Sequence, residues 1–97
     1  MDIATFRRTL GEAEPPRDLA PALAALWWAG KGDWDRAHMI VMDIDSHDAA
    51  HVHGYLHRVE GDLDNARYWY RTARRTPATG PLDEEWNAIV TELLARG

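Results

Sequence analysis

The sequence predicts an all-α domain of about six helices, and three observations lead to this class. Apolar residues recur at helical spacing, most clearly in the series from Trp86 to Leu94. No stretch alternates β-branched with polar residues, and no Asn-Gly or Asp-Gly pair marks a hairpin turn. The pattern Gly-Asp-x-Asp-x-Ala occurs at residues 32–37 and again at 61–66. Such a recurrence is typical of stacked helical hairpins, in which each unit buries its apolar face against the next.

The N-terminal part is predicted to hold two helices. A short helix over residues 2–10 begins with Asp2 as a plausible N-cap, and the pair Pro15-Pro16 follows its end. A second helix is predicted from about residue 17 to residue 29. Pro21 then falls in its first turns, where the missing backbone N–H costs little.

Four further helices are predicted from the turn residues between them. Asp33 caps a helix over about 34–44, and Gly61 ends the next helix, 47–60, at a position that favours glycine. A fifth helix covers about 64–75. The last begins near residue 81, where three acidic side chains suit the positive end of the helix dipole, and runs to about 96. We expect Trp86 to pack on the fifth helix, so that the last helix covers the end of the stack.

Length and composition predict one domain over residues 1–97 and exclude several classes of function. The chain has no cysteine, which excludes disulfides and thiolate chemistry and favours a cytoplasmic location. A net charge of −5 argues against bulk nucleic-acid binding. No apolar run approaches the ~20 residues of a membrane span, and the N-terminus lacks the apolar region of a signal peptide.

The second hairpin resembles the tetratricopeptide (TPR) repeat. The matching positions are Gly54, Gly61-Asp62, Ala66, Tyr70, Ala73 and Pro77. The upstream copy fits less well, and the 29-residue offset is shorter than the usual 34, so the chain is described as TPR-like. The resemblance implies repeat hairpins over about 17–77 and a C-terminal solvating helix over about 81–96. The chain is also similar to small bacterial TPR-like proteins that contain a segment like HVHGYLHRVEGDLDNARYWYR.

The resemblance implies an adaptor that binds a partner protein or peptide in a concave groove. The expected groove residues are His51, Tyr55, Arg58 and Leu26. In the related proteins an aromatic residue usually stands at the position of His51 and an alanine at that of Gly54. These departures indicate a locally emptied site, natural or engineered, beside the groove. The oligomeric state is left open.

The histidines predict an alternative function. On one helix, His53, His57 and Glu60 lie within about 60° of one another. Side chains at i and i+4 can chelate a transition metal, and His38 joins them if its helix packs alongside. Such a pocket could also hold haem, or use His51 as a catalytic base or nucleophile. Buried histidines more often only hydrogen-bond to the protein. No catalytic triad is ordered by the sequence, so it does not decide whether the chain is an enzyme. We expect His51 to be more exposed than His53 or His57.

Overall fold

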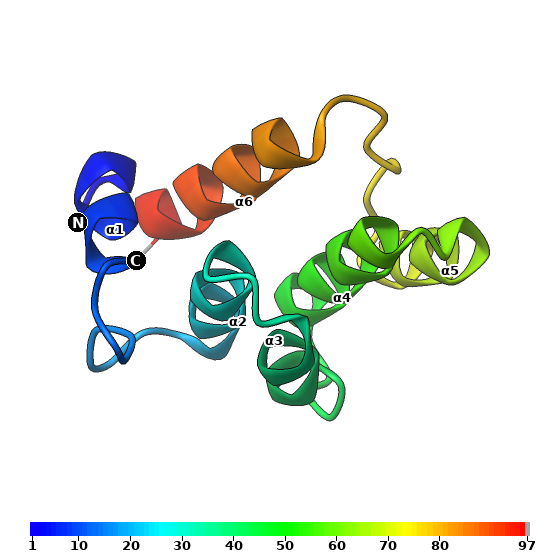
Figure 1. Cartoon of the computed structure of the whole chain (residues 1–97). Helices are drawn as coiled ribbons and strands as arrows, with labels where there is room; N and C mark the ends of the chain where they lie inside the picture. The colour runs from blue at the N-terminus through cyan, green and yellow to red at the C-terminus, as the bar shows by residue number, and fades with distance from the viewer. Residues whose placement is uncertain (97) are drawn as a thin grey trace.

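The computed structural model describes residues 1–96 and confirms the all-α class (Figure 1). Its six helices are α1 (Ile3–Thr9), α2 (Pro21–Gly30), α3 (Trp34–Val41), α4 (His47–Glu60), α5 (Leu63–Thr72) and α6 (Leu82–Arg96). This part of the chain contains no strand. None of the six helices is both long enough and apolar enough to cross a membrane. The cytoplasmic location stays a prediction.

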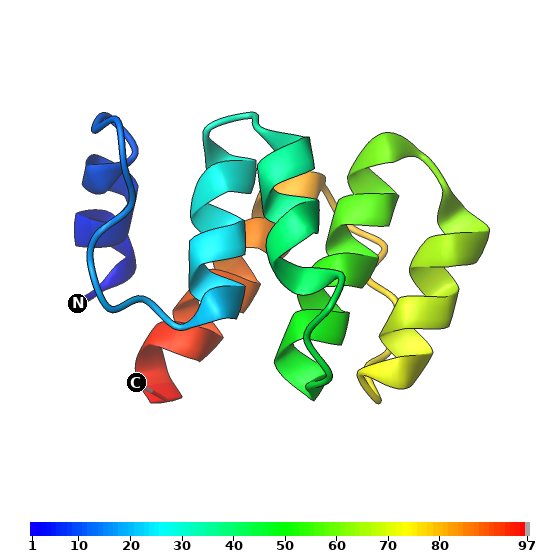
Figure 2. The same ribbon diagram turned by 90° about the horizontal axis from the view of Figure 1, so that it is seen from below.

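Helices α2 to α5 lie side by side in chain order, and α6 lies on one face of this row (Figure 2). Helix α1 packs on α6. From α2 to α5, successive helices run in alternate directions in this view. The most extensive helix contacts are between α2 and α3 and between α4 and α5. Helix α6 packs against α1, α2 and α4. The C-terminal helix thus lies over the face that α2 and α4 share (Figure 1).

The two Gly-Asp turns have the same backbone geometry. Gly32 and Gly61 both adopt left-handed φ angles, 83° and 88°, which glycine reaches without a steric cost. The aspartate after each glycine caps the next helix by accepting a hydrogen bond from the backbone N–H three residues on. That distance is 3.0 Å at Asp33 and 3.3 Å at Asp62. The recurrence in the sequence therefore encodes two equivalent helix–turn–helix connections.

Three helix ends differ from the predicted ones. Helix α2 begins at Pro21 rather than near residue 17, because Ala20 is extended (ψ 149°), as residues before proline usually are. Helix α3 ends at Val41, three residues before the predicted end. Helix α5 ends at Thr72, and Arg74 then adopts a left-handed φ of 60°, which takes the chain out of the helical path.

The main hydrophobic core joins all of the helices except α5, which packs on α4. Its largest fully buried side chains include Phe6 from α1, Trp27 from α2, Val52 from α4 and Val90 from α6. The two alanines of the repeated pattern are buried, and their small side chains allow neighbouring helices to approach closely. Ala37 is 0% exposed and Ala66 is 2% exposed.

The predicted position of Trp86 is wrong. Its indole Nε1 donates a hydrogen bond to the backbone oxygen of Leu26 in α2 at 2.8 Å, and its ring lies 5.9 Å from that of Phe6 in α1. The segment 73–81 carries the chain from the end of α5 back to the start of α6, on the face of α2 and α4 (Figure 1). Helix α6 therefore covers the α2–α4 face and not the outer side of α5.

Candidate metal centre

Three histidines from two helices meet between α3 and α4. His38 comes from α3, and His53 and His57 come from α4. Each offers one ring nitrogen, and these nitrogens all lie within 4.8 Å of one another. The Nε2 atoms of His38 and His53 are 3.0 Å apart. We call these three residues the histidine cluster. The sequence predicted that His53 and His57 share one face of a helix and that His38 lies on the preceding helix. The structure brings all three together.

Local geometry explains the cluster. His53 and His57 are one turn apart on α4, so their rings stack with centroids 4.8 Å apart. The tight Gly-Asp turn before α3 and the short connection after it place α3 against α4. This contact brings His38 to His53.

Two tryptophans hold the histidine rings in place. The Trp34 ring stacks on His38 at 4.7 Å with an interplanar angle of 11°, and Trp69 of α5 stacks on His53 at 3.9 Å and 14°. The indole of Trp34 is itself fixed, because it donates to the backbone oxygen of Leu56 at 2.6 Å. Rings confined in this way are preorganised, so ordering them for a ligand costs little further entropy.

Glu60 orients one member of the cluster. Its Oε1 lies 2.5 Å from Nδ1 of His57, where it can accept the Nδ1–H hydrogen. This contact leaves the Nε2 lone pair of His57 free. Metal-binding histidines typically donate their second ring N–H to a carboxylate in this way. The sequence predicted that Glu60 is itself an oxygen ligand of the metal. In the structure Glu60 instead holds the ring of His57, which would be the ligand.

Burial favours the neutral form of two members of the cluster, His53 and His38. His53 is 4% exposed, and this burial, followed by the nearby His38 and His57, lowers its pKa from 6.5 to about 4. Burial also lowers the pKa of His38. Neutral imidazoles keep the lone pairs that a metal requires. The Nδ1 atom of His53 is buried with no hydrogen-bond partner in the described residues, so the protein does not satisfy every polar atom of the cluster.

The metal-free protein is expected to lose stability as the pH falls from about 6.5 to about 4. His53 takes up a proton near pH 6.5 in the unfolded chain but only near pH 4 in the folded one. The unfolded state therefore binds more protons in this window, and the free energy of unfolding falls by about 3 kcal/mol across it. His38 acts in the same direction. Urea titrations at several pH values test this, with His53→Ala as the comparison. Identical pH profiles for the two proteins would contradict it.

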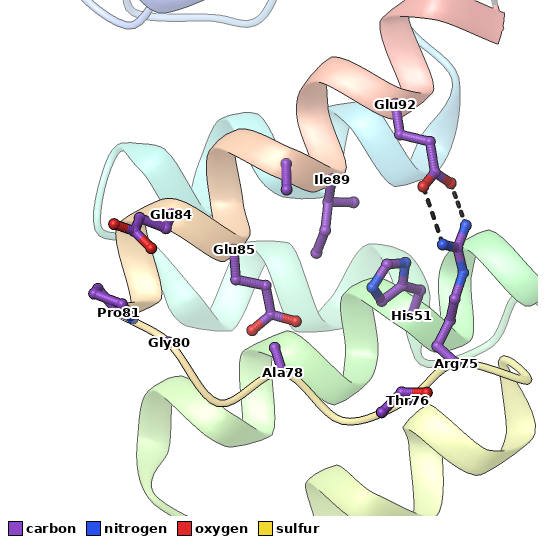
Figure 3. Close-up of a pocket in the computed structure, with 11 residues that line it drawn as sticks. His51, Arg75, Thr76, Ala78, Gly80, Pro81, Glu84, Glu85, Ile89 and Glu92 are labelled. Atoms are coloured by element: carbon purple, nitrogen blue, oxygen red, sulfur yellow. Dashed lines mark hydrogen bonds and ion pairs between the residues drawn. The ribbon is translucent and has the colours of Figure 1, made fainter.

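His51 lies on another side of α4, in a cavity of about 330 Å³. The cavity is bounded by α4, the segment 73–81 and α6, and the guanidinium of Arg75 pairs with Glu92 at its edge (Figure 3). As predicted, His51 is more exposed than His53 and His57, being half-buried. Burial and then the positive charge of Arg75 lower its pKa. His51 is therefore separate from the histidine cluster.

The other residues predicted for partner binding do not form an open groove. Leu26 is 0% exposed and Tyr55 is 6% exposed, because α6 covers the face to which they belong. Contact of these residues with a partner stays a prediction. Gly54 does not leave an empty space either. A Cβ there would lie 3.3 Å from the ring of Tyr70, so the glycine permits close packing between α4 and α5.

Arg58 belongs to a buried polar network that the sequence did not reveal. Its Nη1 donates to Oε1 of Glu85 at 2.9 Å, and it also donates to the backbone oxygen of Gly80. The hydroxyl of Tyr70 donates to the other oxygen of Glu85 at 2.5 Å. Glu85 is only 7% exposed, although its place near the start of α6 made it look like an exposed dipole partner. The sequence did contain an indication that Glu85 is buried, because Glu85 lies four residues before Ile89 and so on the same apolar face of the helix.

The resemblance to TPR-like proteins stays a prediction, because no protein-family model, curated protein or solved structure was found to match this chain. The chemistry of the histidine cluster is therefore the basis on which a function can be inferred.

Proposed function

We propose that this protein binds a divalent first-row transition metal ion, with zinc as the reference case, through the histidine cluster. The observation that carries the proposal is the convergence of three ring nitrogens within 4.8 Å, two of them from buried residues. Water does not hydrogen-bond to the ring nitrogens of buried imidazoles, so these atoms need partners inside the protein. The Nε2 atoms of His38 and His53 face each other across a hydrogen bond of 3.0 Å, in which one ring donates and the other accepts. A metal ion would take the place of this hydrogen once the donating ring carries its hydrogen on Nδ1.

The donor set selects the class of metal. Imidazole nitrogen suits Zn²⁺, Cu²⁺, Ni²⁺ and iron, whereas Ca²⁺ and Mg²⁺ require oxygen ligands. Zinc binds imidazole at 2.0–2.1 Å, so two nitrogens of a tetrahedral site lie about 3.3 Å apart. The His38–His53 separation of 3.0 Å is within a few tenths of an ångström of this value. Small rotations of the rings would bring the third nitrogen to the same distance.

The ion would join helices that belong to different hairpins. His38 is in α3, which pairs with α2, while His53 and His57 are in α4, which pairs with α5. A ligand that binds only the folded chain stabilises it by about 2.7 kcal/mol at 100 times its Kd. We therefore propose that the metal also clamps the two hairpins together.

Haem is a poorer match to the cluster. The His38 and His53 nitrogens are 3.0 Å apart, and tryptophan rings stack directly on both imidazoles. This packing leaves no room for a macrocycle between them. Partner binding by a TPR-like adaptor stays a prediction, because α6 covers two of the four residues proposed for it.

Replacing a ligand, His53, is expected to weaken zinc binding more than replacing Glu60, which holds the ring of His57. Calorimetric titration should give one site per chain, with His53→Ala abolishing it. Glu60→Gln should weaken zinc affinity roughly 10- to 100-fold, as is typical of outer partners of ligating histidines. His47→Ala is the matched control, because His47 lies exposed at the start of α4, outside the cluster. Equal affinity in the wild-type and His53→Ala proteins would exclude the proposal.

A further inference from the structure

We infer that the bound ion keeps one coordination position for a small external donor, on the side of His38. This inference rests on the proposed function and deepens it. It concerns what the site does with its metal: an ion held by three protein ligands can accept water or a small anion, whereas an ion with four is closed.

The first step is the donor count. Among the described residues, three histidines form the group of potential ligands that includes His53, and no carboxylate belongs to that group. His57 also belongs to a second group, with the carboxylates of Glu60 and Asp62, but Asp62 accepts the capping hydrogen bond from the backbone N–H of Asn65. Glu60 is turned to Nδ1 of His57. The remaining histidines are elsewhere: His51 lines the cavity beside α6, and His47 is exposed at the start of α4. A four-coordinate ion would thus obtain its fourth ligand from outside this set.

The second step is the direction of access. His53 and His57 are 4% and 6% exposed, and Trp69 covers the outer face of His53. His38 is half-buried and belongs to the short helix α3, so the solvent side of the cluster is the His38 side. The three nitrogens converge from the protein interior and from α3. We therefore expect the fourth position of a tetrahedron to lie on the His38 side.

The third step is the chemistry of the ligand. Zinc held by three histidines with one open position is the arrangement found in catalytic centres, and structural zinc sites use four protein ligands. The ion would act as a Lewis acid and lower the pKa of a bound water. The expected ligands are small donors that suit a borderline metal: water or hydroxide, azide, thiocyanate and free imidazole. The site would therefore be a reactive centre in addition to a clamp.

Cobalt substitution tests this inference separately from the proposed function. Co²⁺ added to the metal-free protein should give the strong visible absorption of a tetrahedral site at one equivalent, and His53→Ala should lose it. Azide is then added to the cobalt-loaded protein. We expect a saturable change in the visible bands, with one azide bound per cobalt. His47→Ala should respond like the wild type.

Two results would overturn the inference, and they are distinguishable. A tetrahedral cobalt spectrum that azide and thiocyanate leave unchanged would show a saturated site, so the open position would be wrong and metal binding by the cluster would stand. If cobalt instead gives the same spectrum with wild-type and His53→Ala protein, the cluster does not hold the ion. Both the inference and the proposed function then fail.

Discussion

Replacing Trp86 by alanine is expected to destabilise the protein by about 3–5 kcal/mol, a large share of the stability of a domain of this size. The side chain is 6% exposed and fills the junction of α1, α2 and α6. The substitution removes the contact with Phe6 and leaves the backbone oxygen of Leu26 without its hydrogen bond. Chemical denaturation, with the free energy extrapolated to water, measures the effect.

Trp86→Phe separates the two contributions at this position. Phenylalanine keeps part of the aromatic contact but lacks the indole N–H and the second ring, so we expect a smaller loss than for alanine. The hydrogen bond alone is worth about 1 kcal/mol. If Trp86→Ala were as stable as the wild type, α6 would not be docked on α2, and the arrangement of the C-terminal helix would have to be revised.

Replacing Glu85 by alanine is expected to cost about 3–5 kcal/mol, because it leaves a partly buried charge and a hydroxyl without their acceptor. Arg58 would retain only its contact with the backbone of Gly80, and the hydroxyl of Tyr70 would lose its partner. The same denaturation experiment measures this loss.

Glu84→Ala is the matched control for Glu85→Ala. Glu84 is the neighbouring residue with the same side chain, but it is exposed, so its replacement should change the free energy of unfolding by less than about 0.5 kcal/mol. Equal effects of the two substitutions would show that the charge of the helix start matters and that the buried network does not.

Local features of the fold could be predicted from the sequence because their causes are local. An aspartate that caps a helix and a glycine that ends one act within a few residues, so the turns at Gly32 and Gly61 were recognisable. The position of α6 was not. Its apolar spacing shows that one face is buried, but the same face could have covered α5 or the α2–α4 surface. The segment 73–81 and the contacts of Trp86 decide between them.

The site was predictable to the same extent. Helical spacing alone placed His53, His57 and Glu60 on one side of α4, since these residues share a helix. His38 depended on the packing of α3 against α4, which a sequence pattern does not determine. The burial of Tyr55 was missed for a related reason, because Tyr55 faces the side of α4 that α6 covers. Helical angles order the faces of one helix, but they do not identify the neighbour of each face.

The most direct test of the metal site is a long-range ¹H–¹⁵N correlation spectrum of the five histidine rings, recorded before and after one equivalent of zinc. Our account predicts that the ring nitrogens of His38, His53 and His57 shift on zinc binding. His57 should keep its hydrogen on Nδ1, where Glu60 accepts it. The rings of His47 and His51 should not change. Shifts confined to His47 and His51, with the cluster unaffected, would contradict the account.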